Sequence, residues 1–256
     1  MKIDCKSIDN IPIIEVVENS TVGMKLIKNV IKLFDGNLLF NSSNVFKSTL
    51  KRDDFSGAHF IELKDENLLN DTFYLPFKEN SVTAMELPST GTVQTFITAR
   101  MNGCSFYICR NLFTKKIVVC HANAINSSAD DVKSVKDLVN KSPNWQSFNT
   151  QKSLARMMDI FSEKYKSKGN LQLLRSLYKD EYFKIVNHAS NFYYLIKSIP
   201  SNDAVNFIGG TIVIGFRKNN KWSFYYQTIM NTNNINIKNY KLNYKIIESK
   251  KFFEEY

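Results

Sequence analysis

The sequence predicts an α+β fold in which mixed or antiparallel β-sheets pack as a sandwich and helices surround them. Short apolar runs rich in β-branched and aromatic residues fill much of residues 37–122 and return over residues 210–248. Between these regions, apolar residues recur at the spacing of amphipathic helices. Strands at both ends with helices in the middle are typical of the α+β class. No linker-like segment divides the chain, which favours one domain over residues 1–256.

The first part of the chain is expected to consist mainly of strands. Residues 1–20 are expected to form an irregular N-terminal extension, and residues 22–33 carry apolar side chains near helical spacing. Residues 91–99 are rich in β-branched and aromatic types, which favours a strand, although their number also permits a short helix. The other strands expected here are residues 37–41, 58–62 and 71–77, with a connection over residues 79–88.

After residue 121 the apolar pattern becomes helical. Two apolar runs, at residues 210–216 and 222–229, flank a polar turn and predict a β-hairpin. Residues 239–248 are the last expected strand, and a mobile charged tail follows them. The helices expected from the apolar spacing are residues 130–139, 153–165, 171–178, 187–198 and, as a short one, 202–208.

The composition limits the classes of partner. The formal net charge is +10. A solvated, Lys-rich surface accounts for this charge, and steering towards an acidic partner or a nucleic acid is the alternative. No nucleic-acid-binding motif accompanies the charge. No apolar run approaches the length of a membrane span. The four cysteines show no Cys-x-x-Cys spacing, so we expect a reduced compartment and no metal or other cofactor.

A second predicted hairpin carries the candidate chemistry. Residues 105–110 and 116–120 are two apolar runs that a few turn-prone residues separate. An antiparallel return would bring Cys104, before the first strand, next to His121, after the second. A thiol beside an imidazole is the minimum set for nucleophilic catalysis, because the imidazole accepts the thiol proton. The alternative is a cysteine that acts as a small buried hydrophobe and a structural histidine.

The remaining cysteines and histidines are interpreted as structural. Alternation of side chains along a strand directs Cys109 away from Cys104, and Cys120 away from its neighbour in the sequence, His121. His59 falls on an expected strand and His188 near the start of an expected helix. We therefore assign no chemical role to these four residues.

The segment around Cys104 resembles the Burkholderia lethal factor 1-like family of glutamine deamidase toxins, within a wider group of cytotoxic necrotizing factors and the chemoreceptor deamidase CheD. That group has a Leu-x-Gly-Cys turn and a later His, and the lethal factor and CheD have a Thr six residues before the Cys. Met101-Asn102-Gly103-Cys104, His121 and Thr98 correspond here, with Met101 as a volume-conserving replacement of the Leu. Patches that resemble the family in the same order are residues 74–78 (YLPFK), 208–213 (IGGTIV) and 223–227 (SFYYQ).

The resemblance implies a Cys-His-Thr site. In such a site Cys104 is the nucleophile, His121 is the base, and Thr98 orients the imidazole. The backbone N–H groups of Cys104 and Gly103 would then bind the oxyanion of the tetrahedral intermediate. Phe77 replaces a Trp of the family, so the contact with the target protein can differ if this ring faces the substrate. The candidates for the substrate rim are Phe77 and Lys78.

The resemblance also implies a function. The protein would be a protein-glutamine deamidase toxin that converts a Gln of a host protein to Glu. It would block translation by acting on the initiation helicase, eukaryotic initiation factor 4A. Rho-family GTPases are the alternative target, transglutamination the alternative reaction, and a non-catalytic binding module on the same fold the alternative function. The N-terminus lacks the apolar segment of a Sec signal peptide. We therefore expect a monomer made in the bacterial cytoplasm and delivered to, or released into, a host cytosol.

Overall fold

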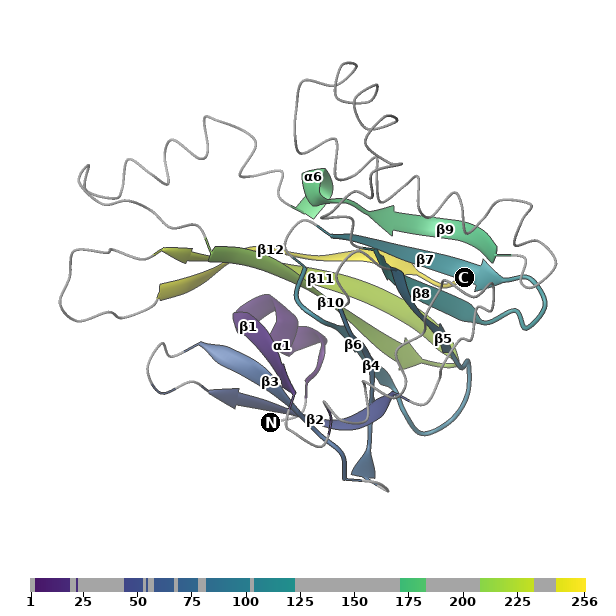
Figure 1. Ribbon diagram of the computed structural model, residues 1–256, viewed down its shortest axis with the longest axis horizontal. Helices are drawn as coiled ribbons and strands as arrows, with labels where there is room; N and C mark the ends of the chain where they lie inside the picture. Colours follow the sequence, from purple (N-terminus) through teal and green to yellow (C-terminus); the bar gives the residue numbers. More distant parts are fainter. Residues whose placement is uncertain are drawn as a thin grey trace, which may run out of the picture.

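Strands dominate the computed structural model (Figure 1). Of the residues that it describes, 66% lie in strands and 7% in helices, and the strands form a curled β-sheet. The expectation of an α+β sandwich with surrounding helices is therefore wrong. None of the helices in this part of the chain is long and apolar enough to cross a membrane. The structure describes residues 3–18, 22, 44–52, 54, 58–66, 69–77, 82–101, 104–122, 171–182, 208–232 and 243–256.

Eight strands form the larger of two hydrogen-bonded sheets, in the order β1-β3-β2-β4-β6-β10-β11-β12. Neighbouring strands are antiparallel, except for the parallel pairs β1–β3 and β4–β6. Distant parts of the chain meet in the middle of this sheet, because β6 pairs with β10. The strands are β1 (Ile13–Glu18), β2 (Val45–Arg52), β3 (His59–Lys64), β4 (Thr72–Leu75), β6 (Thr95–Thr98), β10 (Ile208–Lys218), β11 (Lys221–Thr232) and β12 (Asn243–Glu254).

Four antiparallel strands form the smaller sheet, in the order β5-β8-β7-β9. One face of this sheet packs on the larger sheet through the main hydrophobic core. At its centre, Phe96 of β6, Phe106 of β7 and Phe224 of β11 lie with ring centroids 5.7 to 6.2 Å apart. The strands are β5 (Val82–Leu87), β7 (Ser105–Asn111), β8 (Ile117–Ala122) and β9 (Leu171–Leu177).

The N-terminal segment belongs to a second core on the larger sheet. Helix α1 (Cys5–Asn10) begins after Asp4, whose carboxylate accepts a hydrogen bond of 2.8 Å from the backbone of Ser7. Ile8 on this helix and Ile13 on β1 are both buried in the second core. The expected irregular extension over residues 1–20 is therefore wrong for residues 3–18, which form a helix and a strand.

Gln227 of β11 fixes this N-terminal segment in place. Its side-chain oxygen accepts a hydrogen bond of 2.7 Å from the backbone N–H of Ile13. Its amide nitrogen donates to the backbone carbonyls of Ile11, at 2.9 Å, and Ile8. The Gln227 side chain is 1% exposed, so these bonds satisfy backbone groups that are shielded from water.

The predicted elements agree with the structure where strands are joined by short turns. Both predicted hairpins are confirmed, as β7–β8 and β10–β11. The helix expected at residues 171–178 is instead β9, an edge strand paired with β7. Strand β5 lies within the expected connection, and the expected charged tail continues β12. The predicted elements at 37–41, 130–139, 153–165 and 187–198 lie outside the described residues. So do those at 22–33 and 202–208, apart from Val22 and from Ile208, which begins β10.

Replacing Gln227 by Met, which has a similar shape, should destabilise the fold by about 2–4 kcal/mol. The variant leaves the Ile13 N–H and two carbonyls of the N-terminal segment without their buried partner. Urea unfolding of both proteins measures the difference. Gln172→Met on the exposed surface of β9 is the matched control and should stay within about 0.5 kcal/mol of the unsubstituted protein. Equal stability of the two variants would contradict the assigned role of Gln227.

Candidate functional site

The register of the β7–β8 hairpin sets the relation between Cys104 and His121. Phe106 lies directly opposite His121, and Ser105 opposite Ala122. Cys104 comes one residue before β7, so it lies diagonally across the pair from His121. Diagonal neighbours on one face of an antiparallel pair stand roughly 7–8 Å apart between Cα atoms. The hairpin thus brings together two residues that are distant in the sequence.

The two sides of the smaller sheet separate the candidate residues from the other thiols. Cys104 and Phe106 belong to the core between the sheets, and His121 shares this face because it lies opposite Phe106. Cys109 and Cys120 belong to a separate cluster on the other face. Alternation along the strands predicts this division, so neither Cys109 nor Cys120 lies on the same face as the imidazole.

Hydrogen bonds hold the backbone of Met101 and of Cys104. Met101 exchanges two backbone hydrogen bonds with Thr211 of β10, of 2.7 and 2.9 Å. The buried Tyr182 hydroxyl donates a hydrogen bond of 2.8 Å to the backbone carbonyl of Cys104. Tyr182 lies on the short helix α6 (Lys179–Tyr182), and its own carbonyl accepts from the hydroxyl of Thr228. Sequence patterns gave no signal for Tyr182, since the contact spans 78 residues.

The structure describes only some of the predicted oxyanion and rim residues. Gly103 and Lys78 lie outside the described residues. Cys104 itself is 5% exposed and His121 is 1% exposed. Neither side chain is therefore open to solvent. The physical reason is that the pair lies at the margin of the core between the sheets.

Phe77 covers the imidazole of His121. The two ring centroids are 5.7 Å apart, at an interplanar angle of 54°. Phe77 is 41% exposed, so its ring separates the buried histidine from solvent on that side. Thr83, which lies opposite His121 on β5, donates a hydrogen bond of 2.7 Å to the carbonyl of Pro76. This bond ties the backbone just before Phe77 to the strand beside His121.

The imidazole of His121 is buried and lacks hydrogen bonds. Both ring nitrogens are shielded from solvent, and neither has a hydrogen-bond partner among the residues that the structure describes. Burial lowers the pKa of His121 from 6.5 to about 4, because the charged form loses its hydration. The side chain is therefore neutral near physiological pH, and no hydrogen bond links it to Cys104 or Thr98.

Thr98 lies on the larger sheet, facing the smaller one. It is fully buried and shares a face of β6 with Phe96, which belongs to the core between the sheets. Its hydroxyl oxygen accepts a hydrogen bond of 3.2 Å from the backbone N–H of Val213 on β10. Among the described residues, no hydrogen bond joins Thr98 to the imidazole, and the Thr98 hydroxyl oxygen binds the neighbouring strand.

Comparison with known proteins leaves the chain without an assigned family. No protein-family model matches the sequence, and no curated protein matches it. Within the described ranges, no group of three or more His, Cys, Asp or Glu side chains could hold a metal ion. His188 lies outside these ranges. His59 is partly buried on β3 of the larger sheet, whereas His121 lies on β8 of the smaller one.

The lowered pKa of His121 predicts a specific loss of stability in acid. Between its folded pKa of about 4 and its ordinary value of 6.5, the unfolded chain binds a proton that the folded chain does not. The free energy of unfolding should therefore fall as the pH falls through this window, by about 2 kcal/mol between pH 7 and pH 5. Denaturant unfolding of the unsubstituted protein and His121→Gln at both pH values measures this contribution.

The comparison between pH values is made within each protein, so the direct cost of the substitution cancels. His121→Gln should lose less stability than the unsubstituted protein between the two pH values. His59→Gln is the control and should keep most of the pH dependence, since His59 is only partly buried. The same loss in His121→Gln and in the unsubstituted protein would show that the imidazole is not held neutral by the fold.

Proposed function

We propose that this chain is a cysteine-dependent protein-glutamine deamidase, with Cys104 as the nucleophile and His121 as the base. The observation that carries the proposal is a buried imidazole whose two nitrogens have no hydrogen-bond partner in the described structure, on the same face as a thiol. A buried histidine with a purely structural role normally makes hydrogen bonds, because an unsatisfied polar group costs about 1–3 kcal/mol. Unsatisfied nitrogens beside a thiol fit a site that awaits its reactant.

The neutral state of His121 defines how the first step would run. With a pKa of about 4, the imidazole is uncharged near neutral pH, and its unprotonated ring nitrogen can accept a proton. It takes the thiol proton while the sulfur attacks the side-chain carbonyl carbon of a glutamine, in place of a preformed thiolate–imidazolium pair. The tetrahedral intermediate collapses when the imidazolium returns this proton to the amide nitrogen, and ammonia leaves. The product of this half-reaction is a thioester on Cys104.

Water completes the reaction at the same site. The neutral imidazole removes a proton from water, which attacks the thioester carbonyl and releases the glutamate side chain and the thiol. The backbone N–H of Cys104 is the proposed donor to the oxyanion in both half-reactions. Thr98 is the proposed orienting residue, and its bond to Val213 fixes the hydroxyl in the layer that faces His121. The substrate glutamine has to reach past Phe77, whose ring covers the imidazole.

The proposed substrate is a glutamine on a host protein. The resemblance to the Burkholderia lethal factor 1-like family supports the initiation helicase, eukaryotic initiation factor 4A, as the first target to test, and a Rho-family GTPase as the second. Host cytosol is the proposed place of action. Peptide mass spectrometry of each purified target, incubated with the protein, would detect the mass gain of close to one dalton that converts an amide into an acid.

Cys104→Ser should fold normally and abolish deamidation, because the serine hydroxyl ionises far less readily than a thiol. Cys109→Ser, on the strand β7 that follows Cys104, is the matched control. It should retain activity because its side chain lies on the opposite face. Peptide mass spectrometry of the target gives activity, and the melting temperature reports folding. Deamidation by Cys104→Ser at the rate of the unsubstituted protein would rule out this nucleophile.

One observation favours a non-catalytic binding module as the second candidate. The Cys104 and His121 side chains are 5% and 1% exposed, and no hydrogen bond joins them. In that case the pair is only part of the core. The rate of Cys104 labelling by iodoacetamide separates the candidates. If the imidazole activates the thiol, Cys104 should react roughly tenfold more slowly in His121→Gln than in the unsubstituted protein. An unchanged rate of Cys104 labelling, with normal folding, would favour the binding module.

A further inference from the structure

The turn between β7 and β8 exposes two large apolar side chains. Leu112 is 40% exposed and Phe113 is 72% exposed. They lie at the opposite end of the hairpin from Cys104, because β7 starts just after Cys104 and ends at Asn111. Phe113 is the most exposed phenylalanine among the side chains that the structure describes. An aromatic ring held in water at the tip of a hairpin is a feature that core packing does not explain.

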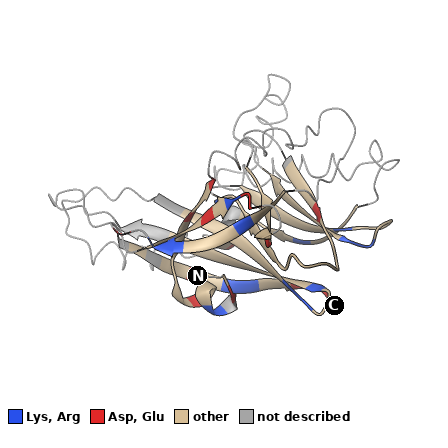
Figure 2. Ribbon diagram, turned by 90° about the horizontal axis from the view of Figure 1, so that it is seen from below, with Lys and Arg blue, Asp and Glu red and all other residues tan. Residues whose placement is uncertain are grey.

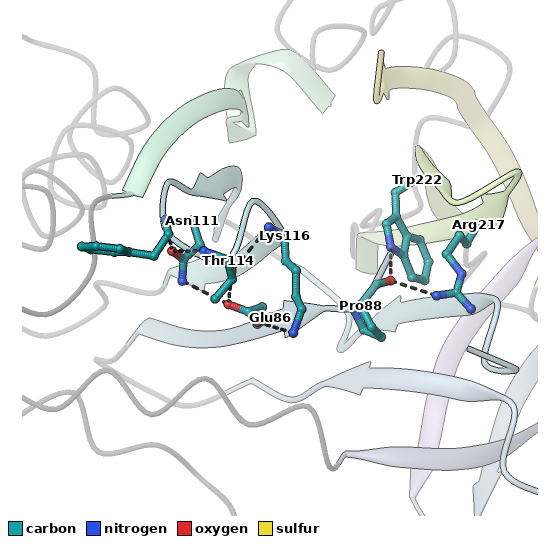
Figure 3. Close-up of polar contacts among 8 residues, drawn as sticks. Glu86, Pro88, Asn111, Thr114, Lys116, Arg217 and Trp222 are labelled. Carbon is teal, nitrogen blue, oxygen red and sulfur yellow. Dashed lines mark hydrogen bonds and ion pairs between the residues drawn. The ribbon is translucent and has the colours of Figure 1, made fainter. Parts of the chain in front are cut away.

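Hydrogen bonds hold this tip in one conformation (Figure 3). The side-chain oxygen of Asn111 accepts from the backbone N–H groups of Phe113 and Thr114, at 2.9 and 3.2 Å. Glu86 of β5 accepts from the Asn111 amide at 3.1 Å and from the Thr114 hydroxyl at 2.9 Å, and it forms an ion pair with Lys116 at 3.0 Å. The Phe113 ring is therefore presented by a pre-ordered turn, so that little conformational entropy is lost on binding.

A second turn lies at the same end of the molecule. The side chains of Arg217 and Trp222, at the base of the β10–β11 turn, both donate to the carbonyl of Pro88, at 2.9 and 3.0 Å. Pro88 directly follows β5, whose last residue, Leu87, lies opposite Ile117 at the start of β8. The two turns are therefore held together through β5, as Figure 3 shows.

Exposed lysines lie on both of these turns. Lys115 in the first turn is exposed, as are Lys218 and Lys221 beside the second. Three carboxylates at this end are matched by cations, since Glu86 pairs with Lys116, Glu255 with Arg110 and Glu254 with Lys251. In Figure 2, blue segments lie on strands that lead to the end of the molecule marked C. The exposed lysines thus leave this end with a net positive charge.

We propose that this end of the molecule binds an anionic lipid surface, with Phe113 and Leu112 inserted at the boundary between headgroups and acyl chains. Aromatic and leucine side chains favour this boundary, and lysines beside them contact the lipid phosphates. The cations come from two separate turns and flank a projecting tip, which fits a broad anionic surface better than a single pocket. This membrane contact is independent of the function proposed for Cys104.

Vesicle sedimentation tests the proposal with the full chain. Vesicles of phosphatidylcholine with about one third phosphatidylserine should bind the protein, and pure phosphatidylcholine vesicles should bind it at least about fivefold more weakly. Phe113→Ser should reduce binding to the anionic vesicles by at least about fivefold, because it removes the inserted ring. Leu69→Ser is the matched control, since Leu69 is 63% exposed on a different loop and should leave binding unchanged.

Two further variants separate insertion from general attraction. Vesicles with brominated acyl chains should quench the fluorescence of the tryptophan introduced by Phe113→Trp. They should not quench that of the tryptophan introduced by Leu69→Trp. Replacing both Lys218 and Lys221 by Gln should weaken binding to anionic vesicles without changing the melting temperature. Equal vesicle binding by Phe113→Ser and the unsubstituted protein would overturn the proposal. The proposal would also be overturned if Phe113→Ser kept its vesicle binding but lost binding to single-stranded RNA or to the target protein.

Discussion

The contact of Phe106 with Phe96 and Phe224 is the interaction on which the remaining structure depends. It joins the inner face of the smaller sheet to the middle of the larger one, with centroid distances of 6.0 and 6.2 Å from the Phe106 ring. Because side chains alternate along β7, fixing Phe106 in this core also fixes the direction of Cys104, two residues earlier. His121 lies opposite Phe106, so the same contact buries the imidazole. The character of the candidate site thus follows from how the two sheets meet.

Local rules were sufficient for the part of the site that one hairpin contains. The apolar runs on both sides of residues 111–115 predict the hairpin whose register places Cys104 diagonally across from His121. The twofold period of a strand predicts that Cys109 faces away. The contacts made by Phe77 and Tyr182 could not be predicted, because they join His121 and Cys104 to other strands and helices. Such contacts depend on how separate elements pack, which the periodicity of one segment does not record. For the same reason, the hydrogen bond between Thr98 and Val213 was missed.

The errors in the fold have a similar origin. The leucine spacing of residues 171–177 suits a helix, yet β7 offers a free edge with unpaired backbone groups, and pairing along it outweighs the helical preference. At the N-terminus, the spacing between Ile8 and Ile13 does not indicate a helix or a strand. They gain order from the second core and from Gln227, which is more than 200 residues away. Both segments acquire their structure from partners that come later or earlier in the chain.

The pairing of β6 with β10 has a consequence for the synthesis of this protein on the ribosome. Strand β6 ends at Thr98, but the strand that covers its open side begins only at Ile208. While the intervening chain is synthesised, that edge is open to pairing with a second nascent chain. Folding that relies on such distant pairing is also slow, because the entropy of closing a long loop is lost before any contact forms. Until translation has passed β10, the first half of the chain therefore presents an unpaired strand edge.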